Sequence, residues 1–274
     1  MNILKIELRK ISKGLIIWNI ALCSMLAMYI MFFPSMKDAG FSALANAKIN
    51  MMPEAIKAAF GMSNMPDLSI YIEYLGYILQ YIIIGVSVYA LILGTKALSS
   101  EEQDKTIEFQ MANPISRTQL ISYKMLAGFI AVTIMMISLL IISIIGGAMY
   151  SKTSYLMETI TIIKMSIIPS YIYLFIGFAF SAVFKKSMAT PGVALGIFFG
   201  SYVIGVMAGV IDKISWLKYI SPANYVIASD VLKSNLVDSA KGNFNMTGIY
   251  IGMVIVVVSI ITTYVVYSKK DMEI

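Results

Sequence analysis

Residues 126–148 read LAGFIAVTIMMISLLIISIIGGA, an apolar stretch without a single charged side chain. A helix of about 20 such residues is long enough to cross the hydrocarbon core of a bilayer. In lipid every backbone N–H and C=O group must find a partner within the protein, which a helix provides by itself. The stretch therefore predicts a transmembrane helix.

Five further stretches have a similar length and composition, so we expect an all-α polytopic membrane protein with six transmembrane helices. The predicted spans are 15–33, 70–94, 126–148, 162–184, 190–211 and 247–267. Over the 274-residue chain 59% of the residues are hydrophobic and 13% are charged, whereas a soluble domain carries about 25% charged residues. We expect one membrane domain that covers residues 1–274.

The basic residues are distributed unevenly between the two loop faces that six spans create. The face with both termini holds 12 of the 21 Lys and Arg residues in about 55 loop residues, and the other face holds nine in about 86. Because Lys- and Arg-rich loops stay in the cytoplasm, we expect both termini to be cytoplasmic in a multi-pass protein of the cell membrane. The net charge of +6 then indicates membrane lipid as a partner, and not nucleic acid.

Residues 1–14 combine basic character with a helical apolar repeat. Leu4, Leu8, Ile11 and Leu15 recur at the spacing of one helix face. This pattern predicts an interfacial amphipathic helix on the inner leaflet before the first span. A basic flank without a defined helix is the alternative.

Residues 99–124, SSEEQDKTIEFQMANPISRTQLISYK, form a charged insert between the second and third spans. Capping-box patterns begin at Ser100 and at Ser116, and Asn113–Pro114 separates them. We expect a helix over 99–115, a sharp break, and a second helix that continues into the third span. Exposed apolar residues on the first helix favour docking to a partner over a plain solvated hairpin. These residues are Ile107, Phe109 and Met111.

The fifth predicted span, 190–211, carries glycines at helical spacing. Small residues at this spacing let two helix backbones approach closely. We therefore expect a tight contact with another span of the chain or with a second subunit. The glycines are Gly192, Gly196, Gly200, Gly205 and Gly209.

The next segment, 212–235, is too interrupted to span a bilayer and too apolar for a solvated loop. Its residues Trp216, Tyr219 and Tyr225 are typical of a membrane interface, and Ser221–Pro222 divides it. We expect two short re-entrant or interfacial helices on the outer face.

Motifs for nucleotide, metal or nucleophilic chemistry are missing from the sequence. No GxxxxGK[ST], HExxH or GxSxG pattern occurs, histidine is absent, and Cys23 is the single cysteine. We expect no catalytic residue, metal site or cofactor on this chain. One face of the second span carries polar side chains that line a transport pathway or bond to neighbouring helices, although the acid among them lies near the water boundary. These residues are Glu73, Tyr77, Gln80 and Tyr81.

The charged insert resembles the signature of ABC-2 type ABC transporter permeases. The likeness consists of an acid-rich start, a Thr-Ile-Glu step at 106–108, a Pro-Ile-Ser-Arg turn at 114–117, and Lys124 before the third span. It extends over nearly the whole chain. Further matching stretches are MPEAIKAAFG at 52–61, FKKS at 184–187 and ISPANY at 220–225.

The resemblance implies the permease subunit of an ATP-driven bacterial exporter. In this family two six-helix permeases pair as a homodimer or heterodimer, and each docks a separate ATP-binding subunit that holds ATP and Mg. The helix over 99–115 is then a coupling helix in a groove of that subunit. The residues implied in the contact are Glu101, Glu102, Asp104, Ile107, Glu108, Phe109, Met111 and Arg117.

The cargo is less constrained by the sequence. Surfaces rich in Met and Tyr favour an apolar or amphipathic cargo, such as a peptide, toxin or drug. Two other classes stay open: a non-transporting sensor or immunity subunit on the same fold, and a membrane-embedded enzyme, against which the missing histidine counts. Cargo-stimulated ATP hydrolysis and vesicle transport separate the exporter from the sensor.

Overall fold

Six long helices form the structure, which is a computed structural model. It describes residues 3–53, 56–57, 67–99, 116–151, 155–184, 191–227, 231 and 246–269. The helices long and apolar enough to cross a membrane are α1 (Ile3–Met36), α4 (Tyr71–Ala97), α7 (Arg117–Tyr150), α8 (Leu156–Val183), α9 (Pro191–Val210) and α11 (Met246–Lys269). No strand occurs in the described ranges. The predicted all-α fold with six spans is confirmed.

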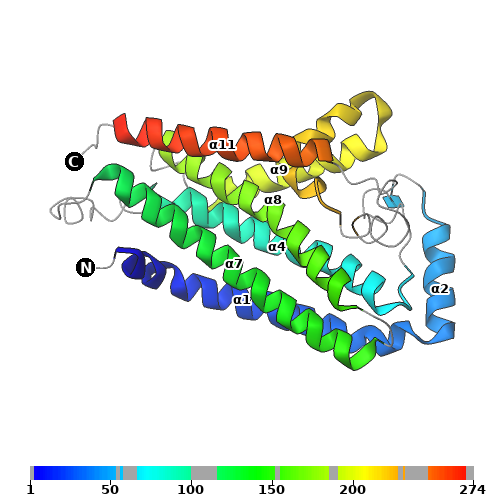
Figure 1. The fold of residues 1–274 in the computed structure, drawn as a ribbon. Helices are drawn as coiled ribbons and strands as arrows, with labels where there is room; N and C mark the ends of the chain where they lie inside the picture. Colours follow the sequence, from blue (N-terminus) through cyan, green and yellow to red (C-terminus); the bar gives the residue numbers. More distant parts are fainter. Residues whose placement is uncertain are drawn as a thin grey trace.

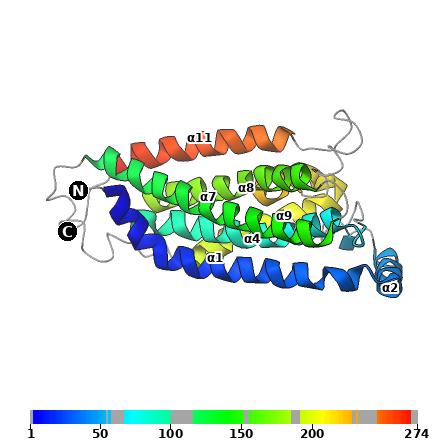
Figure 2. The ribbon, with the colours of Figure 1, turned by 60° about the horizontal axis from the view of Figure 1, so that its bottom comes forward.

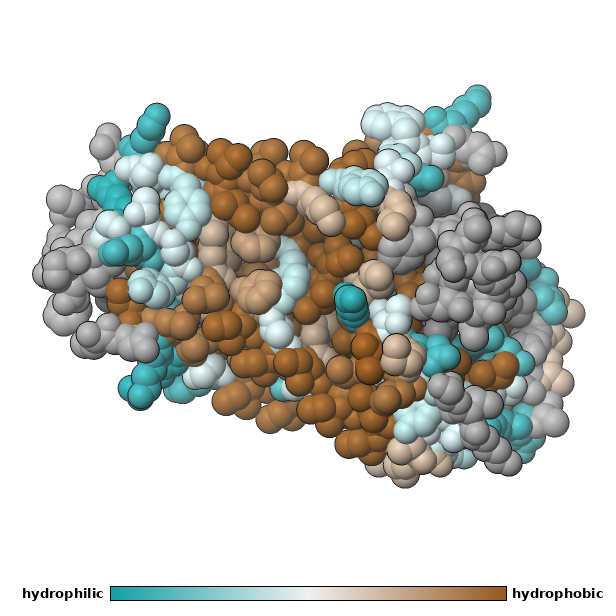
Figure 3. Space-filling view, viewed as in Figure 1, coloured by the Kyte–Doolittle hydropathy of each residue, from teal (hydrophilic) through white to brown (hydrophobic). Residues whose placement is uncertain are grey.

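The six helices lie side by side along one direction (Figure 1). The start of α1 and the end of α11 share one end of the bundle with the end of α4 and the start of α7. We call this the terminal end, and its opposite the far end. Helices α4 and α8 are central, because 67% and 56% of their most apolar stretches are buried, against 17% for α1 and 22% for α9 and α11. The outer helices expose apolar side chains, which form a hydrophobic band between two more polar ends (Figure 3), as a bilayer requires.

Two glycines bring the central helices α4 and α8 into backbone contact. A Cβ atom added at Gly94 would lie 2.9 Å from the Cα of Gly177. One added at Gly177 would lie 2.7 Å from the carbonyl oxygen of Leu91. A side chain at either position must therefore push the two helices apart.

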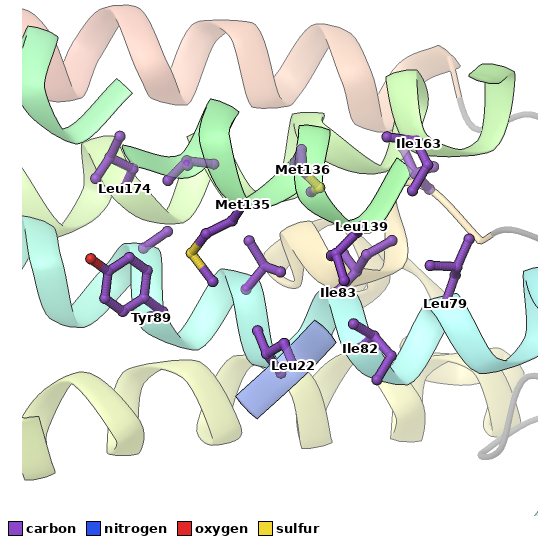
Figure 4. Close-up of a cluster of buried hydrophobic side chains, with 14 of the residues drawn as sticks. Leu22, Leu79, Ile82, Ile83, Tyr89, Met135, Met136, Leu139, Ile163 and Leu174 are labelled. Atoms are coloured by element: carbon purple, nitrogen blue, oxygen red, sulfur yellow. The ribbon is translucent and has the colours of Figure 1, made fainter. Parts of the chain in front are cut away.

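Polar side chains and apolar packing join the other helices to this centre. Asn19 Nδ2 of α1 donates to Ser138 Oγ of α7 at 3.1 Å, and Tyr71 OH of α4 donates to the carbonyl oxygen of Ser143 at 2.8 Å. Such bonds between helices are worth about 1 kcal/mol each. Apolar side chains of α1, α4, α7 and α8 fill the space between them (Figure 4), among them Leu22, Tyr89, Met135 and Leu174.

Helix α1 joins two segments that the sequence analysis separates. It runs without interruption over Ile3–Met36, so the predicted interfacial helix 1–14 and the predicted span 15–33 belong to one helix. No proline interrupts the junction, and Gly14 alone lowers helix stability without ending a helix. The first turns incline away from the axis of the rest of α1 (Figure 2), and the face that they turn to the bundle includes the buried Glu7.

Short helices cover the far end of the bundle. They are α2 (Ala39–Asn50), η1 (Asp212–Ile220) and η2 (Pro222–Asn224). The division between η1 and η2 falls at Ser221, where the sequence predicts it; that these helices enter the membrane stays a prediction. Burial raises the pKa of Tyr225 to about 12, so its hydroxyl keeps its proton and donates to the carbonyl oxygen of Tyr219.

Candidate functional site

A small polar cavity lies inside the bundle toward the far end, between α4, α8, α9 and η2. Its volume is about 20 Å³, which is room for about one water molecule. Its polar lining consists of Gln80, Ser87, Ser166, Tyr202 and Asn224. Polar side chains from four elements converge here. Inside a membrane bundle such a cluster marks a functional position or joins helices by hydrogen bonds.

Pro169 interrupts the hydrogen bonds of α8 beside this cavity. Proline has no N–H group, so the bond to the carbonyl oxygen four residues earlier, that of Met165, is missing. At the same level Ser87 Oγ and Ser170 Oγ lie 3.2 Å apart and link α4 to α8. Helix α8 is therefore easiest to bend at the level of the cavity.

The four residues predicted to line a pathway occupy three different environments. Gln80 lines the polar cavity. Tyr81 donates to the hydroxyl of Tyr77 at 3.0 Å, so these two phenols bond to each other. Glu73 Oε2 accepts the backbone N–H of Asp67 and holds the chain that enters α4. Of the four, Gln80 is the one that the structure brings to the cavity.

Most of the α9 glycines are exposed rather than packed against another described span. The exposed ones are Gly192, Gly196, Gly200 and Gly209. A Cβ atom added at any of the last three would meet no atom of the described chain within 4 Å. Gly205 differs, because a Cβ atom there would lie 2.5 Å from that of Ser221 in the segment that joins η1 to η2. The tight crossing of two spans within the chain lies between α4 and α8 instead.

Most of the charged insert falls outside the described residues. This holds for Glu101, Glu102, Asp104, Ile107, Glu108, Phe109 and Met111, and for the capping pattern that begins at Ser100. Their predicted contact with an ATP-binding subunit stays a prediction.

Both flanks of the insert are fixed to the helical bundle. The backbone N–H groups of Leu98 and Ser99 donate to Ser181 Oγ of α8 at 3.0 and 3.1 Å. On the other flank the predicted capping box is confirmed, since Ser116 and Gln119 each accept the other's backbone N–H at 3.2 Å. The insert therefore leaves α4 and enters α7 at held positions.

Arg117, the last of the predicted coupling residues, has a contact inside the chain. Its guanidinium donates to the carbonyl oxygen of Ser268 at 3.2 Å, which joins the first turn of α7 to the last turn of α11. A role toward a partner subunit stays a prediction for this residue.

A second, larger cavity lies at the terminal end, and the sequence analysis did not predict it. It encloses about 330 Å³ between α1, α4, α7 and α8. At its edge Glu7 and Lys124 are each 5% exposed, and Glu7 Oε2 lies 3.1 Å from Lys124 Nζ. The other carboxylate oxygen, Oε1, lies 3.3 Å from Lys10 Nζ. The spacing of Glu7, Lys10, Gly14 and Trp18 along one face of α1 is the signal that would have indicated this site.

These features define a multi-pass helical membrane protein with polar sites inside its bundle. Among the residues that the structure describes, no group of three His, Cys, Asp or Glu side chains could hold a metal ion. A sequence model of the family described as ABC-2 family transporter protein matches residues 1–272. The chain belongs to this family of transporters, as the resemblance of the charged insert predicts. Comparison with curated proteins gives no match.

Proposed function

We propose that the chain is the permease subunit of an ATP-driven exporter. The family match over residues 1–272 carries this proposal, and six apolar helices supply the membrane domain that a permease needs. The sequence contains no GxxxxGK[ST] loop for nucleotide phosphates. ATP hydrolysis, with its Mg²⁺, therefore belongs to a separate ATP-binding subunit.

The insert at 99–115 is the proposed docking site for that subunit. The bonds of Leu98 and Ser99 to Ser181 fix one flank to α8, and the capping box at Ser116 fixes the other to α7. A displacement of a segment held at both ends passes directly into rigid helices. This arrangement supports the transmission of ATP-driven movement into the membrane domain.

The terminal end of the bundle is the proposed cytoplasmic end. The 12 Lys and Arg residues on this side, against nine on the other, support this orientation through the positive-inside rule. It also puts the insert on the side of the membrane where ATP is present.

A second permease, identical or related, is the proposed partner for the open glycine face of α9. Gly196 and Gly200 leave room for another helix backbone, and neighbouring Phe199 and Val203 are exposed apolar side chains. Small residues flanked by larger apolar ones are the usual composition of close helix pairs in membranes. Two chains would then meet along their α9 helices.

The proposed cargo is apolar or amphipathic, such as a peptide, a toxin or a drug. The polar cavity at Gln80 is far too small for such a molecule at about 20 Å³. We therefore assign the cavity to a seam between α4, α8 and α9 that opens when α8 bends at Pro169. The cargo would pass between the two permeases.

ATP hydrolysis by the assembled complex tests this function. The chain, co-purified with its ATP-binding subunit and placed in lipid nanodiscs, should hydrolyse ATP faster when an amphipathic cationic peptide is added. The ATP-binding subunit alone should not respond to the peptide. A complex whose hydrolysis rate is unchanged by every cargo offered would contradict the exporter and favour a sensor or immunity subunit.

A further inference from the structure

The cavity at the terminal end has the size and shape of a ligand site. Its volume of about 330 Å³ falls within the range of roughly 300 to 1,000 Å³ that small-molecule sites occupy. Four helices build it, and most of the lining residues come from α1 and α4. The apolar part of its wall includes residues of all four helices, which are Ile11, Ile92, Leu93, Ala127 and Phe178.

The charged residues of the cavity favour an anion. Lys10, Lys96 and Lys124 line it together with a single carboxylate, that of Glu7. Lys10 and Lys124 both contact the Glu7 carboxylate, so the three lysines together exceed the single carboxylate by two positive charges. Basic pockets between transmembrane helices at this level of a membrane are suited to the phosphate of a lipid headgroup.

A buried hydroxyl group gives a second, independent indication of a ligand. Tyr89 lines the cavity and is 4% exposed, and its hydroxyl has no hydrogen-bond partner in the described part of the chain. Its ring lies against Trp18, with 5.7 Å between the ring centroids. A buried polar group is nearly always paired, so a ligand oxygen is the expected partner of this hydroxyl.

We infer that this cavity binds an anionic phospholipid. The lysines hold the headgroup phosphate, Tyr89 donates to a phosphate or ester oxygen, and an acyl chain lies along the apolar wall. The cavity has room at Gly14, where an added Cβ atom would meet nothing within 4 Å. A free phosphate ion would use the lysines but not the apolar wall. This site is independent of the proposed export function.

Lipid binding to the purified full chain tests the inference. Native mass spectrometry would count retained lipids, and titration of the delipidated chain would compare phosphatidylglycerol, phosphatidylcholine and inorganic phosphate. We expect phosphatidylglycerol to bind the most tightly. Lys96→Gln should weaken phosphatidylglycerol binding roughly fivefold, because it removes one basic residue that attracts the anionic headgroup. Lys13→Gln is the matched control, because Lys13 is an exposed lysine of α1 that does not line the cavity.

Two further variants separate a binding role from a structural one. Tyr89→Phe keeps the ring against Trp18 and removes only the donor, so the lipid-free chain should remain folded while affinity falls roughly two- to tenfold. Gly14→Leu should reduce lipid retention by filling open space. Equal binding of the two lipids, equal loss in Lys96→Gln and Lys13→Gln, or binding of inorganic phosphate as tight as that of phosphatidylglycerol would overturn the inference. Retention of no lipid, with a peptide cargo bound at this cavity instead, would overturn it as well.

Discussion

At the scale of single residues, Glu7 joins two helices that are far apart in the sequence. Its carboxylate contacts Lys124 of α7 at 3.1 Å and Lys10 of its own helix at 3.3 Å. A charge this deeply buried is stable only when it is paired. The pair therefore holds the first turns of α1 against the start of α7, next to the flank of the charged insert.

Removal of one partner of this pair should be costly. Lys124→Met leaves the Glu7 carboxylate buried without its main partner, and the free energy of unfolding should fall by about 3–5 kcal/mol. Replacement of both residues, as Glu7→Gln with Lys124→Met, should recover most of the loss. The measurement is a double-mutant cycle on unfolding in mixed detergent micelles. Losses that simply add in the double variant would show that the two side chains are not coupled.

At the scale of elements, the crossing of α4 and α8 decides how tightly the bundle closes. Gly94 and Gly177 let the two backbones meet without an intervening side chain. The crossing lies close to Ser181, which accepts the last N–H groups of the α4 segment at 3.0 and 3.1 Å. In the proposed exporter, movement of the insert would therefore reach this closely packed pair of helices first.

Alanine should destabilise the chain at a glycine of the α4–α8 contact and have little effect at an exposed glycine of α9. Gly177→Ala forces a Cβ atom to within 2.7 Å of the Leu91 carbonyl oxygen, and such overpacking should cost about 1–3 kcal/mol. Gly200→Ala projects into open space within one chain and should change the stability of the monomer by less than about 0.5 kcal/mol. Thermal midpoints of the two detergent-solubilised variants measure the difference. Equal midpoints would mean that the α4–α8 contact is looser than described.

The helices were predictable from the sequence, whereas the contacts between them were not. An apolar run of spanning length requires a helix whatever surrounds it, and the Ser116 capping box is a local pattern, so both follow from sequence. A glycine's role depends on which helix crosses it. The regular spacing in α9 predicts a close contact at that helix, whereas within the chain the isolated Gly94 and Gly177 form it instead. The sequence places Gln80 on a polar face of one helix, but most of the other polar residues of its cavity come from α8, α9 and η2.

The cavity at the terminal end could not be predicted for the same reason. The apolar repeat of residues 1–14 predicts a helix, and the chain forms one. The prediction treats it as a separate element on the membrane surface, because a single sequence does not show that Lys124 faces Glu7. The buried ion pair between α1 and α7 depends on how the helices pack. It holds the first turns of α1 against the bundle, where they line the cavity.

At the scale of the whole molecule, the two cavities lie around one central pair of helices. The polar cavity at Gln80 lies toward the far end, and the basic cavity lies at the terminal end. Helices α4 and α8 line both. In the proposed exporter, ATP-driven movement of the insert displaces this pair at the terminal end, and the bend at Pro169 opens the seam near the other.

An acidic residue in place of an apolar residue of the insert should prevent the permease from binding its ATP-binding subunit. Phe109→Asp, or Ile107→Asp, buries an unpaired carboxylate in the proposed groove, so the ATP-binding subunit should no longer co-purify. Insertion into the membrane should be unchanged. Trp216→Asp is the matched control, because this exposed aromatic residue lies on η1 at the far end. Normal co-purification of both insert variants would show that the insert is not the docking site.

Transport into inverted membrane vesicles tests the central claim most directly. Vesicles that contain this chain and its ATP-binding subunit should accumulate a fluorescent amphipathic peptide when ATP is supplied outside. Accumulation should stop with a non-hydrolysable ATP analogue, and it should fall to background in Phe109→Asp vesicles that hold the same amount of permease. Accumulation that proceeds equally without this chain, or an intact complex that hydrolyses ATP and moves none of the cargoes offered, would contradict the assignment as an export permease.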